Sequence, residues 1–276
     1  MIRPVTGNLL ALSPTTMPDT PPLEYVDAAA AAGYDAVGLR LNRSPLFPFH
    51  PVAGDASLVR ELKRALAGSG LGVLDILSFY LQPVTDIEAF AAPLELGAEL
   101  GARYALVAGD DADASRLRDN LARFCDLARP FGVTAAVEFA VIRPLATLGQ
   151  TLRLLADAGR ENAVVCLDPL NHIRGGGTVA ELRAVDPAVL PYAQISDGVL
   201  GPGEPNLREL GRMSPNQRRL PGEGTLPLHE ILDALPPRLP LSVELPMPKT
   251  ERQSARQWAH TTADSTRRFL DAHALR

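Results

Sequence analysis

The sequence predicts a closed (β/α)8 TIM barrel, in which eight parallel strands are each followed by a helix. Short apolar runs alternate with longer segments of helical periodicity, the apolar runs number eight, and a chain of 276 residues suits this fold. An open, doubly wound sheet is the competing architecture. It is disfavoured because no Gly-x-Gly-x-x-Gly turn follows the first apolar run. We expect a single domain over residues 1–276.

The predicted strands are short apolar runs, several of which end in a polar or acidic residue. Turn-forming residues or helical patterns bound each of them, which is typical of strands in an alternating α/β chain. They are Asn8–Leu12, Ala36–Leu41, Val73–Phe79, Tyr104–Ala108, Thr134–Phe139, Ala163–Asp168, Tyr192–Asp197 and Leu241–Leu245.

The predicted helices carry recognisable start and stop signals. Prolines precede the first helix and Gly33 follows it. Thr85 with Glu88, and Thr147 with Gln150, have the spacing of a capping box. The helices expected are Leu23–Ala32, Leu58–Ala67, Thr85–Leu100, Ser115–Ala128, Thr147–Ala158, Val179–Ala184, Pro227–Leu235 and Arg252–Ala274. Long loops, Asn42–Gly54 and Gly198–Gly224, follow the second and seventh strands, on the face where barrel enzymes carry their active sites.

Composition excludes several classes of protein. The formal net charge is −5 and no basic stretch occurs, which argues against a nucleic-acid partner because phosphate contacts need clustered Lys and Arg. No apolar run is long enough for a membrane-spanning helix, and the first residues lack the apolar segment of a signal peptide. Cys125 and Cys166 are the only cysteines, so a reducing cytoplasm is the expected location.

Four side chains of ligand type lie at the ends of the last four predicted strands: Glu138, Asp168, Gln194 and Glu244. A lone acid there could cap a helix or pair with an arginine. Three carboxylates at one end of a barrel would repel one another, and each would lose hydration. A divalent cation offsets both costs, and oxygen ligands suit Mg²⁺ or Mn²⁺ better than Zn²⁺. The pattern therefore predicts one bound divalent ion.

This ligand order resembles that of the xylose isomerase-like TIM-barrel superfamily of sugar and sugar-phosphate isomerases and epimerases. The segment Arg218-Arg219-Leu220-Pro221-Gly222-Glu223-Gly224 is similar to the Arg…Pro-Gly-Glu-Gly signature of the same group. The chain departs from the pattern at two positions. Gln194 stands where most epimerases have His, which is similar to the 3-dehydroshikimate dehydratase branch. His172 lies one position later than the His of the common Asp-x-x-His motif.

The resemblance implies a metal-dependent isomerase or epimerase that acts on a small sugar, keto-sugar or polyol through a metal-stabilised enediolate. In this reading Glu138 and Glu244 both bind the metal and transfer protons. The first alternative is a lyase that dehydrates 3-dehydroshikimate or a keto-inositol, which Gln194 favours and the shifted His172 weakens. An alternative from another class is a non-catalytic barrel that binds a sugar or a metal.

Further residues are candidates for substrate binding or support. Arg218, Asn171, Arg40 and His50 are expected to contact a small, carbohydrate-like substrate, although Arg40 could instead pair with Asp75 on the third strand.

His172 could be the general acid for a leaving hydroxyl, or a loop histidine bonded to the backbone. Asp197 could orient Gln194 from behind or cap a helix. The loop Pro45–Pro51 could contribute to a homodimer. No phosphate-binding turn is evident after the seventh or eighth strand, so a phosphorylated substrate is not favoured.

Overall fold

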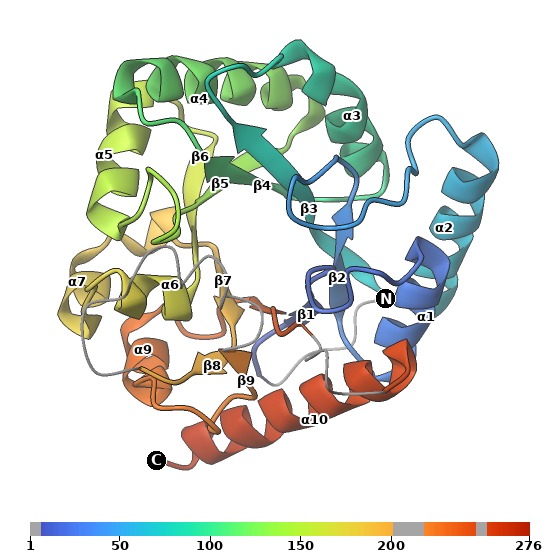
Figure 1. Ribbon diagram of the computed structural model, residues 1–276. Helices are drawn as coiled ribbons and strands as arrows, with labels where there is room; N and C mark the ends of the chain where they lie inside the picture. The colour runs from blue at the N-terminus through green and yellow to red at the C-terminus, as the bar shows by residue number, and fades with distance from the viewer. Residues whose placement is uncertain (1–6, 201–217, 247–252) are drawn as a thin grey trace.

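The computed structural model describes residues 7–200, 218–246 and 253–276, and their strands form a closed barrel (Figure 1). The strand order around the barrel is β1-β10-β7-β6-β5-β4-β3-β2, and every neighbouring pair is parallel. The strands are β1 (Leu10–Leu12), β2 (Ala36–Arg40), β3 (Gly72–Leu81), β4 (Tyr104–Gly109), β5 (Thr134–Glu138), β6 (Ala163–Leu167), β7 (Tyr192–Ile195) and β10 (Leu241–Val243). The predicted fold and all eight predicted strands are confirmed.

Helices surround the barrel, and the last of them, α10, lies beside the first, α1 (Figure 1). They are α1 (Pro22–Ala31), α2 (Ala56–Ser69), α3 (Ala91–Glu99), α4 (Ala114–Ala128), α5 (Leu148–Ala158), α6 (Pro169–Arg174), α7 (Val179–Ala184), α9 (Leu228–Ala234) and α10 (Ala255–Ala274), with 3₁₀ turns at Glu88–Phe90, Arg129–Phe131 and Pro187–Val189. Most predicted helices agree with these to within a few residues at each end.

Two local predictions differ in outcome. The capping box at Thr147 and Gln150 is present at the start of α5. The one expected at Thr85 is wrong, because the Thr85 hydroxyl accepts the Gln82 N–H at 2.7 Å and so closes the turn after β3. The helix in this region begins later, with the 3₁₀ turn at Glu88–Phe90.

The sequence did not predict α6 or a two-stranded antiparallel sheet, β8 (Asp197–Gly198) with β9 (Arg218–Arg219). Asp197, the final residue of the predicted seventh strand, belongs to this small sheet, which lies next to β7 (Figure 1). The pairing brings Arg218 beside the carboxyl end of the barrel. Most of the predicted Gly198–Gly224 loop lies outside the described residues.

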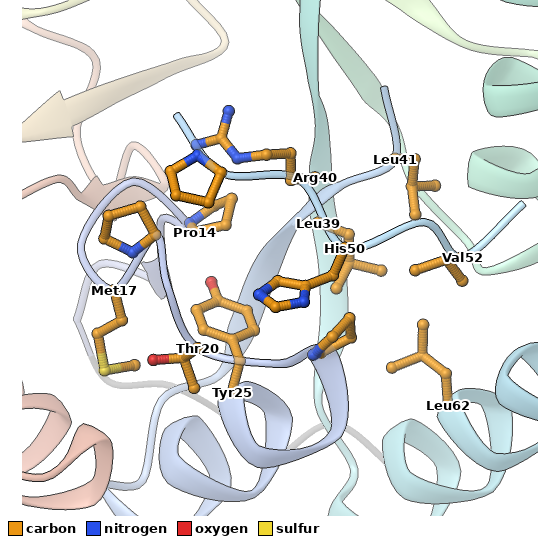
Figure 2. A pocket seen from close by; sticks show the side chains of 13 residues that line it. Pro14, Met17, Thr20, Tyr25, Leu39, Arg40, Leu41, His50, Val52 and Leu62 are labelled. Carbon is orange, nitrogen blue, oxygen red and sulfur yellow. The ribbon is translucent and has the colours of Figure 1, made fainter. Parts of the chain in front are cut away.

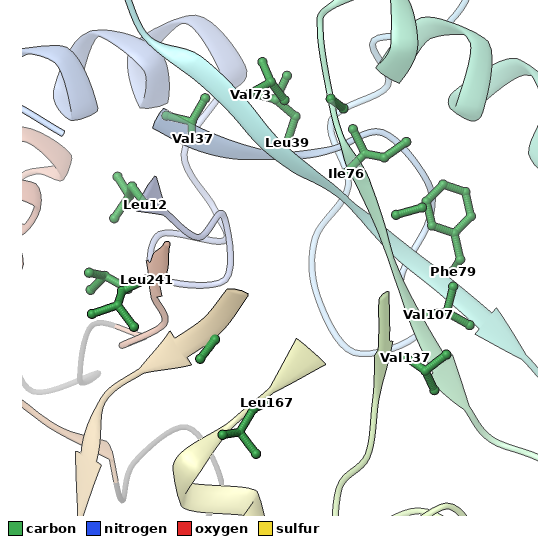
Figure 3. Close-up of a cluster of buried hydrophobic side chains, with 14 of the residues drawn as sticks. Leu12, Val37, Leu39, Val73, Ile76, Phe79, Val107, Val137, Leu167 and Leu241 are labelled. Atoms are coloured by element: carbon green, nitrogen blue, oxygen red, sulfur yellow. The ribbon is translucent and has the colours of Figure 1, made fainter. Parts of the chain in front are cut away.

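Apolar side chains fill both sides of the barrel wall. Those that point outward, such as Val37, Ile76 and Phe79, pack under the helices (Figure 3). A smaller inner cluster includes Leu106, and the stacked rings of Tyr104 and Tyr192 lie with their centroids 4.9 Å apart. Because strand residues alternate between the two sides, residues two positions beyond an inward side chain also point inward.

Both cysteines are buried free thiols, Cys125 on α4 and Cys166 on β6. In the described part of the chain, no helix combines the length and the apolar character needed to cross a membrane.

Candidate active site at the carboxyl end of the barrel

A cavity opens at the carboxyl ends of the strands. Glu138 ends β5 two residues after the inward Ala136, and Glu244 follows β10 two residues after Ser242. Both glutamates line the cavity, as do Asn171 and Arg218. The structure therefore brings four of the predicted site residues to one place.

Arg218 is the centre of charge compensation in this site. Its side chain is only 5% exposed, and its Nη2 atom lies 2.7 Å from Oδ2 of Asp168 and 3.3 Å from Oε1 of Glu244. Its Nη1 donates to the Ser196 hydroxyl at 2.7 Å. Burial acts to lower the pKa of Arg218, but the charges of Asp168 and Glu244 outweigh this effect and raise the pKa above its ordinary value. The guanidinium therefore stays charged. Arg218 was predicted to contact substrate, and here its charge is engaged by the protein's own carboxylates.

The two glutamates differ from ordinary surface carboxyls. The pKa of Glu138 is raised to about 8, chiefly by burial and then by the charges of Glu244 and Asp168, while the charges of Arg143 and Arg218 oppose the rise. Burial also raises the pKa of Glu244, while the Arg218 charge opposes the rise. A carboxyl whose pKa lies near neutrality can both accept and return a proton at physiological pH.

Asp168 is held from three directions. Its Oδ1 accepts the Leu170 N–H at 2.8 Å, which caps α6, and its Oδ2 accepts from the Asn171 amide at 2.8 Å and from Arg218. Both structural alternatives for this acid, the helix cap and the arginine pair, are thus present. Asn171 orients the carboxylate and borders the cavity as well.

Gln194 presents the clearest unsatisfied ligand atom. Its Oε1 is buried and has no hydrogen-bond partner among the described residues. A buried amide oxygen without a partner, on a strand whose neighbour β10 leads into Glu244, fits a hard divalent cation. The residues that would hold such an ion are the predicted set Glu138, Asp168, Gln194 and Glu244. Within residues 7–200, 218–246 and 253–276, no three His, Cys, Asp or Glu side chains are arranged as a metal-binding group.

His172 does not lie where a catalytic general acid of this cavity would be expected. It is 2% exposed, its Nε2 lies 3.0 Å from the Thr178 carbonyl oxygen, and its ring packs against Phe139. It is not among the residues that line the cavity, so the backbone-bonded alternative describes it.

Asp197 was expected to support Gln194, but its hydrogen bonds lead elsewhere. Its Oδ1 accepts the N–H groups of Gly198 and Leu226, and its Oδ2 accepts that of Gly222. Asp197 therefore fixes the segment that follows Arg218. It acts on the site by holding β9 in place.

Arg40 and His50 border a second cavity, which Met17 and Tyr25 also line (Figure 2). His50 lies with Nε2 3.2 Å from the Asp19 carbonyl oxygen and does not line the cavity that contains the glutamates.

Arg40 connects the two cavities through its hydrogen bonds. It donates to the hydroxyls of Ser78 and Thr15, both of which line the cavity at the glutamates. The alternative ion pair with Asp75 is not formed: Asp75 accepts instead from the Tyr192 hydroxyl at 3.1 Å. Arg40 thus contacts the wall of the site without lining it.

The sequence prediction missed several residues of this cavity. Tyr80 is part of β3, which extends past the predicted end of that strand, and Arg143 lies in the loop after β5. Arg174, at the end of α6, also lines the cavity. The rule that places loops after barrel strands on the catalytic face could have identified Arg143.

The sequence matches the family described as "Xylose isomerase-like TIM barrel" over residues 26–271, and the chain belongs to this family. The predicted resemblance is thereby confirmed. No curated protein matches the chain.

Solved structures share the fold at low sequence identity. A xylose isomerase-like TIM barrel/4-hydroxyphenylpyruvate dioxygenase fusion protein aligns with a TM-score of 0.76 and 20% identity over 98% of this chain, which spans only 45% of that protein's length. The IolI protein, whose structure contains a zinc atom, aligns with a TM-score of 0.78 and 20% identity over 96% of this chain and 98% of its own. The probable 3-DHS dehydratase AsbF from Bacillus anthracis aligns with a TM-score of 0.71 and 15% identity over 92% and 97%. Sugar epimerases also occur among the structures with this fold.

Proposed function

We propose that this protein is an isomerase or epimerase that moves a proton at a carbon next to a carbonyl group of a small sugar, keto-sugar or polyol. The observation that carries the proposal is the pair Glu138 and Glu244, which face one cavity, with the charge of Glu244 raising the pKa of Glu138. Members of the family and proteins with this fold include epimerases and a dehydratase, which supports an enzymatic role.

The two glutamates divide the proton transfer between them. Glu138 ends β5 and Glu244 follows β10, and these strands are not neighbours, so the carboxyls approach the cavity from different parts of its wall. One carboxylate removes the proton, and the other carboxyl returns a proton to the other carbon or to the opposite face of the same carbon. The first outcome is isomerisation and the second is epimerisation.

Oxygen donors around the cavity are suited to a divalent cation, Mn²⁺ or Mg²⁺ by the preference of carboxylate and amide ligands. When bound by Glu138, Asp168, Gln194 and Glu244, such an ion would supply Lewis-acid polarisation of the substrate carbonyl. Arg218 meanwhile holds Asp168 and Glu244 in fixed positions. Asn171 keeps the Asp168 carboxylate oriented.

Dehydration of a substrate such as 3-dehydroshikimate is the second candidate. The residue that favours this candidate is Gln194, because a Gln at this ligand position is similar to the 3-dehydroshikimate dehydratase branch. Its buried Oε1 has no hydrogen-bond partner among the described residues. The same proton removal next to a carbonyl would start this reaction, and a β-hydroxyl would leave. Since His172 does not line the cavity, the proton for that hydroxyl would come from one of the cavity glutamates.

Deuterium uptake tests the proposal whatever the product turns out to be. The protein, loaded with Mn²⁺ or Mg²⁺, is incubated in D₂O with ketohexoses, ketopentoses, an inosose and 3-dehydroshikimate, and the substrates are followed by proton NMR. We expect deuterium at the carbon next to the carbonyl of a sugar or inosose. The exchange should be lost in Glu138→Gln. Aromatic absorbance from 3-dehydroshikimate alone would favour the dehydratase, and binding without exchange would favour the non-catalytic barrel.

A further inference from the structure

We propose that the substrate carries an anionic group, a carboxylate or a phosphate ester, and that Arg143 binds it. The inference rests on the proposed function, since it assigns a substrate class to the same cavity. It adds a specificity-determining residue that belongs to neither the predicted metal ligands nor the predicted substrate contacts.

The loop after β5 and the ring of Tyr80 fix the position of the Arg143 side chain. Its backbone N–H donates to the Ala140 carbonyl at 2.9 Å, and the Ala140 N–H donates to Leu145, so the loop after β5 forms a closed turn. The guanidinium lies 4.8 Å from the centre of the Tyr80 ring. The Tyr80 hydroxyl in turn bonds to Ser44, which fixes the ring. The plane of the guanidinium is therefore oriented before any ligand binds.

One donor of this guanidinium is unused. The Nε–H of Arg143 is buried without a hydrogen-bond partner in the described part of the chain. A buried donor without an acceptor is energetically costly, and an arginine edge matches a carboxylate or phosphate better than it matches a single hydroxyl. Arg143 lines the cavity that contains Glu138, so an anion bound there would lie next to the proton-transfer groups.

The charge balance of the cavity points in the same direction. Arg143, Arg174 and Arg218 line it, against the carboxyls of Glu138 and Glu244. Arg218 is compensated by Asp168 and Glu244.

Three guanidinium groups therefore face two carboxyl groups in the lining of the cavity. The crowding of cations is also evident at Arg174, whose pKa is lowered by burial and then by the charge of Arg218. A neutral sugar would offer the buried Nε–H of Arg143 only an uncharged hydroxyl oxygen. An anionic substrate would offer a charged acceptor, and a divalent cation at the carboxylates would make the demand for an anion stronger.

Binding of matched charged and neutral probes tests the inference. Methyl shikimate has a neutral methyl ester where shikimate has a charged carboxylate, and D-fructose 6-phosphate and D-fructose differ by the phosphate. Affinities of the Mn²⁺-loaded protein for all four are measured by titration calorimetry. We expect the native protein to bind the charged member of at least one pair about tenfold or more tightly, as for a hydrogen-bonded ion pair.

The Arg143→Met variant, which keeps an unbranched side chain against Tyr80, should lose this discrimination, and Arg143→Lys should retain part of it. Arg60→Met, on the exposed face of α2, should leave it unchanged. Discrimination in the shikimate pair would assign a carboxylate, and discrimination in the fructose pair a phosphate ester. Equal or undetectable binding of charged and neutral members in both pairs would overturn the inference, as would discrimination that survives in Arg143→Met. Because no turnover is needed, loss of deuterium exchange alone would count only against the proposed function.

Discussion

The Nη2 atom of Arg218 lies 2.7 Å from Oδ2 of Asp168, and both side chains are shielded from water. This pair joins the small β8–β9 sheet to the carboxyl end of β6. It also explains how several carboxylates coexist at one end of the barrel, because the guanidinium supplies the positive charge that their crowding requires.

Removal of the Arg218 charge should therefore destabilise the fold. We expect Arg218→Met to lower the free energy of unfolding by about 3–5 kcal/mol in urea, because Asp168 and Glu244 would be left buried without a counter-charge. Mn²⁺ should recover part of that loss if the carboxylates accept a cation. Arg60→Met is the control and should change little. An unchanged unfolding midpoint in Arg218→Met would contradict the role given to this residue.

Loss of a proton-transfer group should reduce catalysis without unfolding the protein. We expect Glu138→Gln and Glu244→Gln each to reduce deuterium exchange by about 10²–10⁴-fold, the usual contribution of general acid–base catalysis. The exposed Glu95 on α3 provides Glu95→Gln as a matched control. Full activity in either site variant would remove that glutamate from the mechanism.

Asp75 should make stability fall as pH rises. The pKa of Asp75 is raised to about 7, chiefly by burial. The hydrogen bond from Tyr192 opposes this rise and the charge of Glu244 adds to it. In the unfolded chain the carboxyl titrates near pH 4, so the native state binds more protons between about pH 4 and pH 7. The free energy of unfolding therefore decreases across this range.

The Asp75→Asn variant isolates this effect, because its side chain does not titrate. We expect the free energy of unfolding of Asp75→Asn, relative to that of the native protein, to increase by up to about 4 kcal/mol as pH rises from 4 to 8. Urea unfolding at each pH measures this difference. Asp157→Asn, on the exposed side of α5, is the control. A stability difference that does not depend on pH would refute the account.

Asp197 should matter for the order of the segment after β9. Asp197→Ala removes the acceptor for three backbone N–H groups, and we expect it to lower the free energy of unfolding by about 2–3 kcal/mol. Hydrogen exchange at Gly222 and Leu226 should become faster. In the control Asp113→Ala, which removes the cap of α4, exchange at these two amides should stay slow. Unchanged protection at Gly222 in Asp197→Ala would show that the segment is held by other contacts.

The fold could be predicted because its strands are nearly continuous apolar runs and the barrel follows from their number. Local capping was less predictable: Thr85 and Thr147 have the same spacing to their partners, but the Thr85 hydroxyl is already used by the turn after β3. The antiparallel pairing of Arg218 with Gly198 left no pattern in the sequence, because each strand of that sheet has only two residues.

The site was predictable where it depends on strands. Glu138 and Glu244 reach the cavity because strand alternation directs them inward. His172 and Asp197 are polar residues at plausible positions, but nearby backbone groups satisfy them, and the sequence does not show where those groups lie. Arg143 was missed because its position depends on the turn around Ala140 and on stacking against Tyr80, neither of which has a sequence signature.

The stacked rings of Tyr104 and Tyr192 lie near the amino-terminal ends of β4 and β7, and the inner apolar cluster fills the barrel beside them. Small molecules therefore have no passage through the barrel axis, and whatever enters at the glutamates leaves by the same opening. Substrate and product compete for one entrance, so the product should inhibit the forward reaction competitively.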